Sequence, residues 1–106
     1  MPDNFKIIYK YLRVLEKAMD YDELDTDLIK PEALGTTKNR LDSIIAMLVN
    51  DGYVKGYYIK QYLDQDQLTV FAQKPAITLK GLEYLKENSM MQKAANAAKG
   101  IIDIIT

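Results

Sequence analysis

The fold is decided by residues 34–52, which read Leu-Gly-Thr-Thr-Lys-Asn-Arg-Leu-Asp-Ser-Ile-Ile-Ala-Met-Leu-Val-Asn-Asp-Gly. Gly35 ends a short preceding element, and the hydroxyl of Thr37 is suited to cap the free amides of a following helix. Gly52 permits the left-handed conformation that ends that helix. Between them, apolar residues recur at the three- and four-residue spacing of one buried helical face, namely Leu41, Ile44, Ile45 and Leu48. The stretch therefore predicts the turn and second helix of a helix-turn-helix.

The opposite face of this helix carries small polar residues and two flanking cations. At 100° per residue, the residues that point away from the apolar stripe or flank it are Lys38, Asn39, Arg40, Ser43, Ala46 and Asn50. Asn39 and Ser43 are expected to reach base edges, and Ala46 is expected to permit close approach to DNA. Lys38 and Arg40 are expected to hold phosphates.

Residues from Asn4 to about Asp20 predict a first helix, with Asn4 as its cap. Its inward stripe is expected to comprise Phe5, Ile8, Leu12, Leu15 and Met19, joined by Tyr9, Tyr11 and Ala18. Its outward side carries one basic line, formed by Lys6, Lys10, Arg13 and Lys17. This basic line either faces a phosphate or a partner, or it is an ordinary solvated face.

Five acids lie within residues 20–27, after the first helix. A calcium loop would need a glycine at its sixth position and a glutamate at its twelfth, where Asp25 and Pro31 stand. The sequence therefore predicts no metal site. A linker whose negative charges balance the basic line on the first helix is the simpler interpretation. Within it, Leu24 to Ile29 are expected to form a short strand. Residues 30–35 predict a short helix with Pro31 at its first position.

After Gly52 the pattern changes to that of a β-hairpin. Residues 53–63 and 68–71 are rich in tyrosine and branched side chains, and a polar turn with two aspartates separates them. Pro75 is expected to end the second strand. The tyrosines either stack on nucleobases or pack structurally, and the cations Lys55 and Lys60 would add phosphate contacts.

A further helix is predicted over residues 78–88, followed by a helical tail over residues 90–106. Gly81 costs the first of these roughly 1 kcal/mol relative to alanine, which indicates a close contact. Its inward residues are expected to be Leu79, Leu82 and Leu85, beside Tyr84.

The tail carries an apolar stripe near heptad spacing, formed by Met91, Ala94, Ala98, Ile101, Ile102 and Ile105. This stripe is expected to cover the first helix or to meet a second copy of the chain. Only two lysines accompany it, which is too few for a membrane-surface helix.

Composition restricts the function further. The chain has 106 residues, which is one domain by size, and it contains neither cysteine nor histidine. Without a histidine base or a thiolate, and with no positioned carboxylate pair, we expect no enzyme, no cofactor and no metal. The start shows no signal sequence and no run is long enough to span a membrane, so we expect a cytoplasmic protein without a membrane partner. The net charge of −1 predicts that any DNA binding is weak and strongly salt-dependent.

Three groups of residues together resemble the pattern of winged-helix domains. The first group is Leu34-Gly35 before Thr37. The second is Leu48 with Gly52 and Val54. The third is Ile77-Thr78 with Gly81, Tyr84 and Leu85. Thr36 departs from this pattern, because an apolar residue usually follows the Leu-Gly pair. The whole chain is similar to the YjcQ family of small bacterial and phage proteins, most densely over residues 52–56, 79–88 and the tail. The resemblance implies a winged-helix fold but no established activity.

These observations predict an α+β chain. Residues 1–89 form a winged helix-turn-helix, with a three-helix core and a β-hairpin wing, and residues 90–106 form the additional C-terminal helix. The leading hypothesis for function is a DNA-binding transcriptional regulator of phage type. The alternative is a protein–protein interaction module with the same fold and no nucleic-acid binding, which the acidic pI near 5.4 and the apolar tail both suit.

The tail stripe predicts a homodimer, because burying each isoleucine stabilises by roughly 1.5–3 kcal/mol and a second copy offers a matching surface. Light scattering should give a dimer for the full chain and a monomer for a chain ending at Ser89. A monomer in both cases would contradict dimerisation through the tail.

Overall fold

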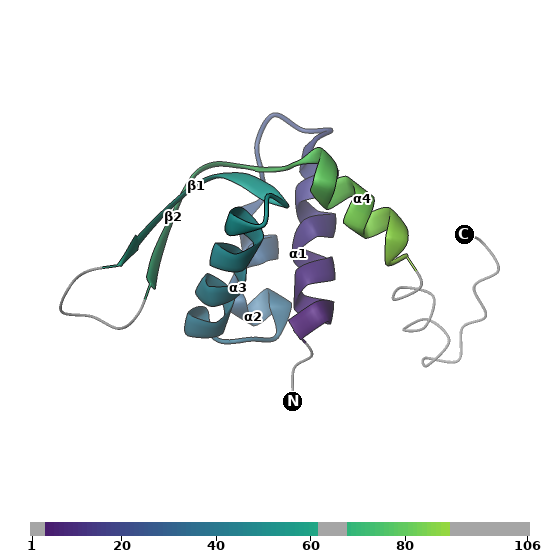
Figure 1. Cartoon of the computed structure of the whole chain (residues 1–106). Coiled ribbons are helices and arrows are strands. Elements are labelled where there is room, and N and C mark those ends of the chain that lie inside the picture. The colour runs from purple at the N-terminus through teal and green to yellow at the C-terminus, as the bar shows by residue number, and fades with distance from the viewer. Residues whose placement is uncertain (1–3, 62–67, 90–106) are drawn as a thin grey trace.

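The computed structural model describes residues 4–61 and 68–89. This part of the chain is an α+β protein with four α-helices and one two-stranded antiparallel sheet. The tail stripe, the predicted dimer contact and the hairpin connection lie outside the described residues. Figure 1 shows the hairpin and α4 on opposite sides of the α1–α3 pair, an arrangement compatible with a winged helix. The elements are α1 (Asn4–Ala18), the 3-10 helix η1 (Thr26–Ile29), α2 (Pro31–Leu34), α3 (Lys38–Asn50), β1 (Val54–Gln61), β2 (Leu68–Ile77) and α4 (Leu79–Glu87).

The core joins α1 and α3 to the base of the hairpin. Its buried side chains include Ile7, Tyr11, Leu12, Leu15, Leu34, Leu41, Ile44, Ile45, Leu48, Val54, Ile77 and Leu85. The expected inward stripe of α1 was partly wrong, because Phe5 and Met19 are 60% and 63% exposed. The stripe is centred on Tyr11 and Leu15, four residues apart, so Ile7 extends it by one turn. Phe5 lies at its edge, and Met19 follows the last residue of α1.

The segment before α2 is not the expected strand. Residues 26–29 form η1, which Asp25 caps by accepting a hydrogen bond from the amide of Asp27 at 3.1 Å. A carboxylate that bonds the backbone two residues later favours a turn over an extended strand.

The turn between α2 and α3 has the predicted chemistry. Gly35 has a φ of 71° and ends α2, and the hydroxyl of Thr37 accepts from the amide of Arg40 at 3.2 Å. Thr36, the residue that departs from the winged-helix pattern, has a buried hydroxyl oxygen without a hydrogen-bond partner among the described residues. An unpaired buried hydroxyl destabilises the fold, so this is a local weakness of the turn.

The hairpin is irregular near its base, where the register shifts between Lys55 and Tyr57. Gly56 occupies the shift with a φ of 87°, and a β-carbon there would lie 1.9 Å from the carbonyl oxygen of Lys74. Pro75, which was expected to end the second strand, lies inside β2. The shift places it opposite the bulge, where a missing amide costs no regular ladder bond.

A contact at the start of α4 closes the hairpin base. The amide of Thr78 donates to the carbonyl oxygen of Tyr53 at 3.1 Å. The hydroxyl of Thr78 donates to the carbonyl oxygen of Gly52 at 2.5 Å and accepts from the amide of Gly81 at 3.2 Å. A β-carbon on Gly81 would lie 2.5 Å from the carbonyl oxygen of Tyr53, which confirms that this glycine serves a close contact.

The inward face of α4 differs from the expected one in a single residue. Leu85 is buried and Leu82 and Tyr84 are half-buried, but Leu79 is 72% exposed. Gly81 and Leu85, four residues apart, define the buried side, and Leu79 points about 200° away from Gly81 around the helix.

Gly56→Ala is expected to destabilise the fold more than Gly35→Ala. Both glycines have a positive φ, so alanine costs each about 1–2 kcal/mol of backbone strain. No atom lies within 4 Å of a β-carbon at Gly35, whereas one at Gly56 meets backbone. Urea unfolding should therefore show a further loss of about 1–3 kcal/mol for Gly56→Ala, and equal losses would contradict the hairpin geometry.

Candidate nucleic-acid interface

The exposed face of α3 is rotated from the predicted one. Asn39 and Ser43 are exposed as expected, but Ala46 is only 4% exposed and Met47 is 52% exposed. The prediction for Ala46 was wrong because α3 packs against both β1 and β2 as well as against the core. The outward stripe therefore passes through Asn39, Ser43, Met47 and Asn50. Close approach to a ligand would occur over a flexible apolar side chain and not over a methyl group.

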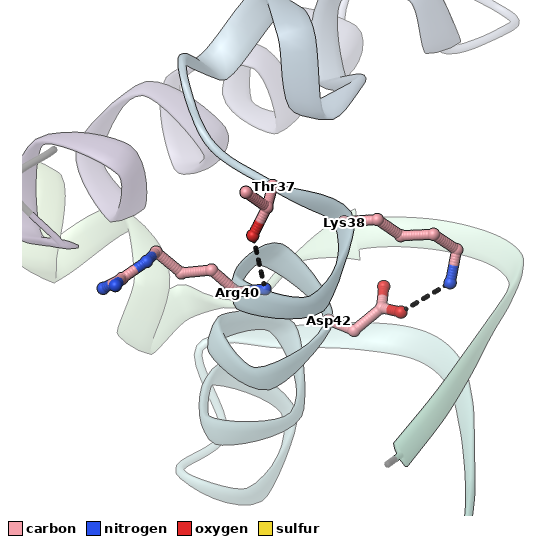
Figure 2. Close-up of polar contacts among 4 residues, drawn as sticks. All are labelled: Thr37, Lys38, Arg40 and Asp42. Atoms are coloured by element: carbon pink, nitrogen blue, oxygen red, sulfur yellow. Dashed lines mark hydrogen bonds and ion pairs between the residues drawn. The ribbon is translucent and has the colours of Figure 1, made fainter.

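Both cations of α3 already have partners. The Nζ atom of Lys38 lies 2.8 Å from Oδ2 of Asp42, and the Nη1 atom of Arg40 donates to Oδ1 of Asn4 at 2.9 Å. Figure 2 shows the two side chains extending in opposite directions from the first turn of α3. Asn4, expected to cap α1, instead ties the starts of α1 and α3 together. Arg40 keeps its charge because its partner is neutral, whereas the charge of Lys38 is largely offset by Asp42.

The basic line on α1 is a solvated face with one neutralised member. Lys6, Lys10 and Lys17 are exposed, and Arg13 forms an ion pair with Glu16. Three more cations lie on the hairpin strands, where Lys55, Lys60 and Lys74 are all exposed. Lys74 was missed from the sequence because the second strand was expected to span only residues 68–71, whereas β2 continues to Ile77.

The acidic linker does not pair with the basic line. Among residues 4–61 and 68–89 each ion pair joins residues three or four positions apart. The Oδ1 atom of Asp27 lies 2.8 Å from the Nζ atom of Lys30. The hydrogen bond from Lys30 and its positive charge lower the pKa of Asp27. No direct ion pair therefore joins the linker to the α1 cations among the described residues, and Asp27 is satisfied locally at lower entropic cost.

The hairpin tyrosines divide into packed and exposed residues. The hydroxyl groups of Tyr11 and Tyr57 hydrogen-bond to each other and join α1 to the inner face of the hairpin. Burial raises the pKa of Tyr57 to about 12 and raises that of Tyr11 further. Tyr53 packs edge-on against Tyr84, with ring centroids 5.6 Å apart. Tyr58, by contrast, is 54% exposed.

The described residues contain neither a membrane-spanning helix nor a cluster of metal ligands. The helices in this part of the chain are too short or too polar to cross a membrane. Residues 4–61 and 68–89 contain no group of three or more acidic side chains placed to hold a metal ion.

The tyrosine pair predicts a pH-dependent stability and a non-additive double variant. An unfolded tyrosine ionises near pH 10 but the folded pair ionises higher, so the unfolded chain releases protons first and stability falls as pH rises above about 10. Tyr57→Phe leaves the hydroxyl of Tyr11 buried and unpaired, which costs about 1–3 kcal/mol.

The double variant Tyr11→Phe/Tyr57→Phe should lose less than the sum of the two single variants, and its stability should depend less on alkaline pH. Urea unfolding at neutral and alkaline pH measures both effects. Additive losses with an unchanged pH profile would show that the two hydroxyl groups do not interact.

The chain was compared with known proteins. The family model YjcQ, described as YjcQ protein, matches residues 9–104. The uncharacterized protein YjcQ of Bacillus subtilis (strain 168) is 35% identical over 72 residues, which cover 68% of this chain and 72% of that protein. No solved structure matches the chain. The match to the family model and the similarity to the Bacillus protein show that the chain belongs to the YjcQ family.

Proposed function

We propose that this chain is a winged-helix module that binds duplex DNA through α3, with the hairpin as its wing. The observation that carries the proposal is the exposure of Asn39 and Ser43 on one outward stripe of α3. Both side chains lie in the first half of a helix that follows a glycine turn, which is where a reading helix presents residues to base edges. Their hydrogen-bonding groups suit contacts in the major groove.

The charges around α3 set the strength of this binding. Arg40 and the hairpin lysines are the available cations, while Lys38 is engaged by Asp42. With about four phosphate contacts per protomer, the logarithm of the binding constant should fall with the logarithm of salt concentration with a slope of magnitude up to about 4. A regulator of this kind would need a second protomer for tight binding, which is the role proposed for the tail.

A protein-interaction module is the second candidate, and Met47 supports it. This side chain is 52% exposed in the middle of the outward stripe of α3, and exposed methionines are common at adaptable protein contacts. On this alternative, Met47→Ala would weaken partner binding while duplex DNA would not bind at all.

Asp42→Asn is expected to strengthen DNA binding. The change removes a negative charge from α3 and releases Lys38, so the affinity should rise at least about twofold at low salt and the salt slope should steepen by about 1. Glu83→Gln, which makes the same charge change on an exposed residue of α4, serves as the matched control. Fluorescence anisotropy with duplexes from a native promoter library measures both.

Two variants test the proposed surface itself. Asn39→Ala/Ser43→Ala should reduce selectivity among duplexes, and Lys38→Glu/Arg40→Glu should abolish binding. Lys6→Glu/Lys10→Glu on α1 gives the same change of net charge away from α3. Absence of duplex binding at low salt, or equal loss in both charge-reversed variants, would contradict DNA recognition by α3.

A further inference from the structure

The outer face of the hairpin carries an aromatic pair. Tyr58 of β1 and Phe71 of β2 are directly opposed in the antiparallel register, so their side chains project from the same face of the sheet. They remain 54% and 43% exposed. Exposed aromatic side chains on neighbouring strands offer apolar surface and ring faces to a ligand, and we call this pair the platform.

The inner face explains why this platform points outward. Tyr57 and Val70, which alternate with Tyr58 and Phe71 along the strands, pack against the core. The hydrogen bond between Tyr57 and Tyr11 fixes that orientation. Because side chains alternate between the two faces of a strand, anchoring the inner residues holds the aromatic pair away from the core.

A cation accompanies the aromatic pair. Lys60 lies two residues from Tyr58 and therefore on the same face, with its Nζ atom 5.9 Å from the centroid of the Phe71 ring. The described strands carry three lysines and no acidic residue, in a chain whose net charge is −1. The two aspartates of the connection lie in residues 62–67, outside the described residues. The outer face of the hairpin is thus suited to a ligand that is an anion and also contains flat rings.

We propose that this outer face binds single-stranded nucleic acid, with unpaired bases stacked on Tyr58 and Phe71 and the backbone phosphates near Lys60. Stacking accepts any base because every base has a flat π-face, and a lysine beside the rings neutralises the phosphate of the stacked nucleotide. An acidic protein would satisfy the lysine but would supply flat rings only through its own aromatic residues. The site is separate from the outward stripe of α3, and the proposal does not depend on duplex binding.

Fluorescence anisotropy with a labelled oligothymidylate of about twelve nucleotides, within the site sizes of such platforms, tests this proposal. The full chain should bind it, and Tyr58→Ala/Phe71→Ala should weaken binding at least tenfold, as expected for lost base stacking. Tyr58→Phe/Phe71→Tyr preserves both rings and should bind as tightly as the unchanged chain. Tyr21→Ala, at a 74% exposed tyrosine outside the hairpin, should also have no effect.

A duplex arm separates the two proposals. Asn39→Ala/Ser43→Ala should leave binding of the single strand intact, whatever it does to duplex selectivity. Circular dichroism checks that the hairpin variants fold. We expect them to fold because both substituted side chains are exposed. Failure of the full chain to bind the oligonucleotide at low salt, or unchanged binding by Tyr58→Ala/Phe71→Ala, would overturn the proposal and leave a protein ligand for this face.

Discussion

The hydroxyl group of Thr78 is the contact on which the arrangement of this protein depends. It donates to the carbonyl oxygen of Gly52 and accepts from the amide of Gly81, so one atom joins the end of α3 to the start of α4. The amide of the same residue closes the hairpin base through Tyr53. This approach requires a residue without a β-carbon at position 81. Lys80 reinforces the junction by donating to the carbonyl oxygen of Asp51 at 2.8 Å.

This junction determines how much of α3 remains free. With the hairpin base held against the end of the helix, both strands pack on α3 and bury Ala46. The exposed stripe is consequently narrower than the polar side of the helix, and it includes the apolar side chain of Met47. The cations at its borders already have partners within the chain, Asp42 for Lys38 and Asn4 for Arg40. A surface with polar side chains and few free cations is better suited to selective contacts with a ligand than to strong electrostatic attraction of that ligand.

The hairpin presents different chemistry on its two faces. The inner face is held to α1 by the hydrogen bond between the hydroxyl groups of buried Tyr11 and half-buried Tyr57. The outer face combines the exposed rings of Tyr58 and Phe71 with Lys60. Figure 1 shows the hairpin extending away from the helices. An acidic chain thus carries strands without an acidic residue, which overall composition conceals because the opposing charges lie elsewhere in the chain.

The sequence by itself determined the order of the four α-helices and the two hairpin strands, the cap at Thr37, the turn at Gly35 and the close contact at Gly81. These features follow from local rules, since a cap or a left-handed glycine acts within a few residues. Only the tertiary structure decided that Ala46 is buried, that Leu79 and Met19 are exposed, and that Pro75 lies within a strand. The spacing of apolar residues gives the direction of a buried helix face only to within about one residue. The element that packs against the helix decides which residues at the border of that face are buried. The hydrogen bond between Arg40 and Asn4 was hidden for a related reason, because the two residues lie 36 positions apart in the chain.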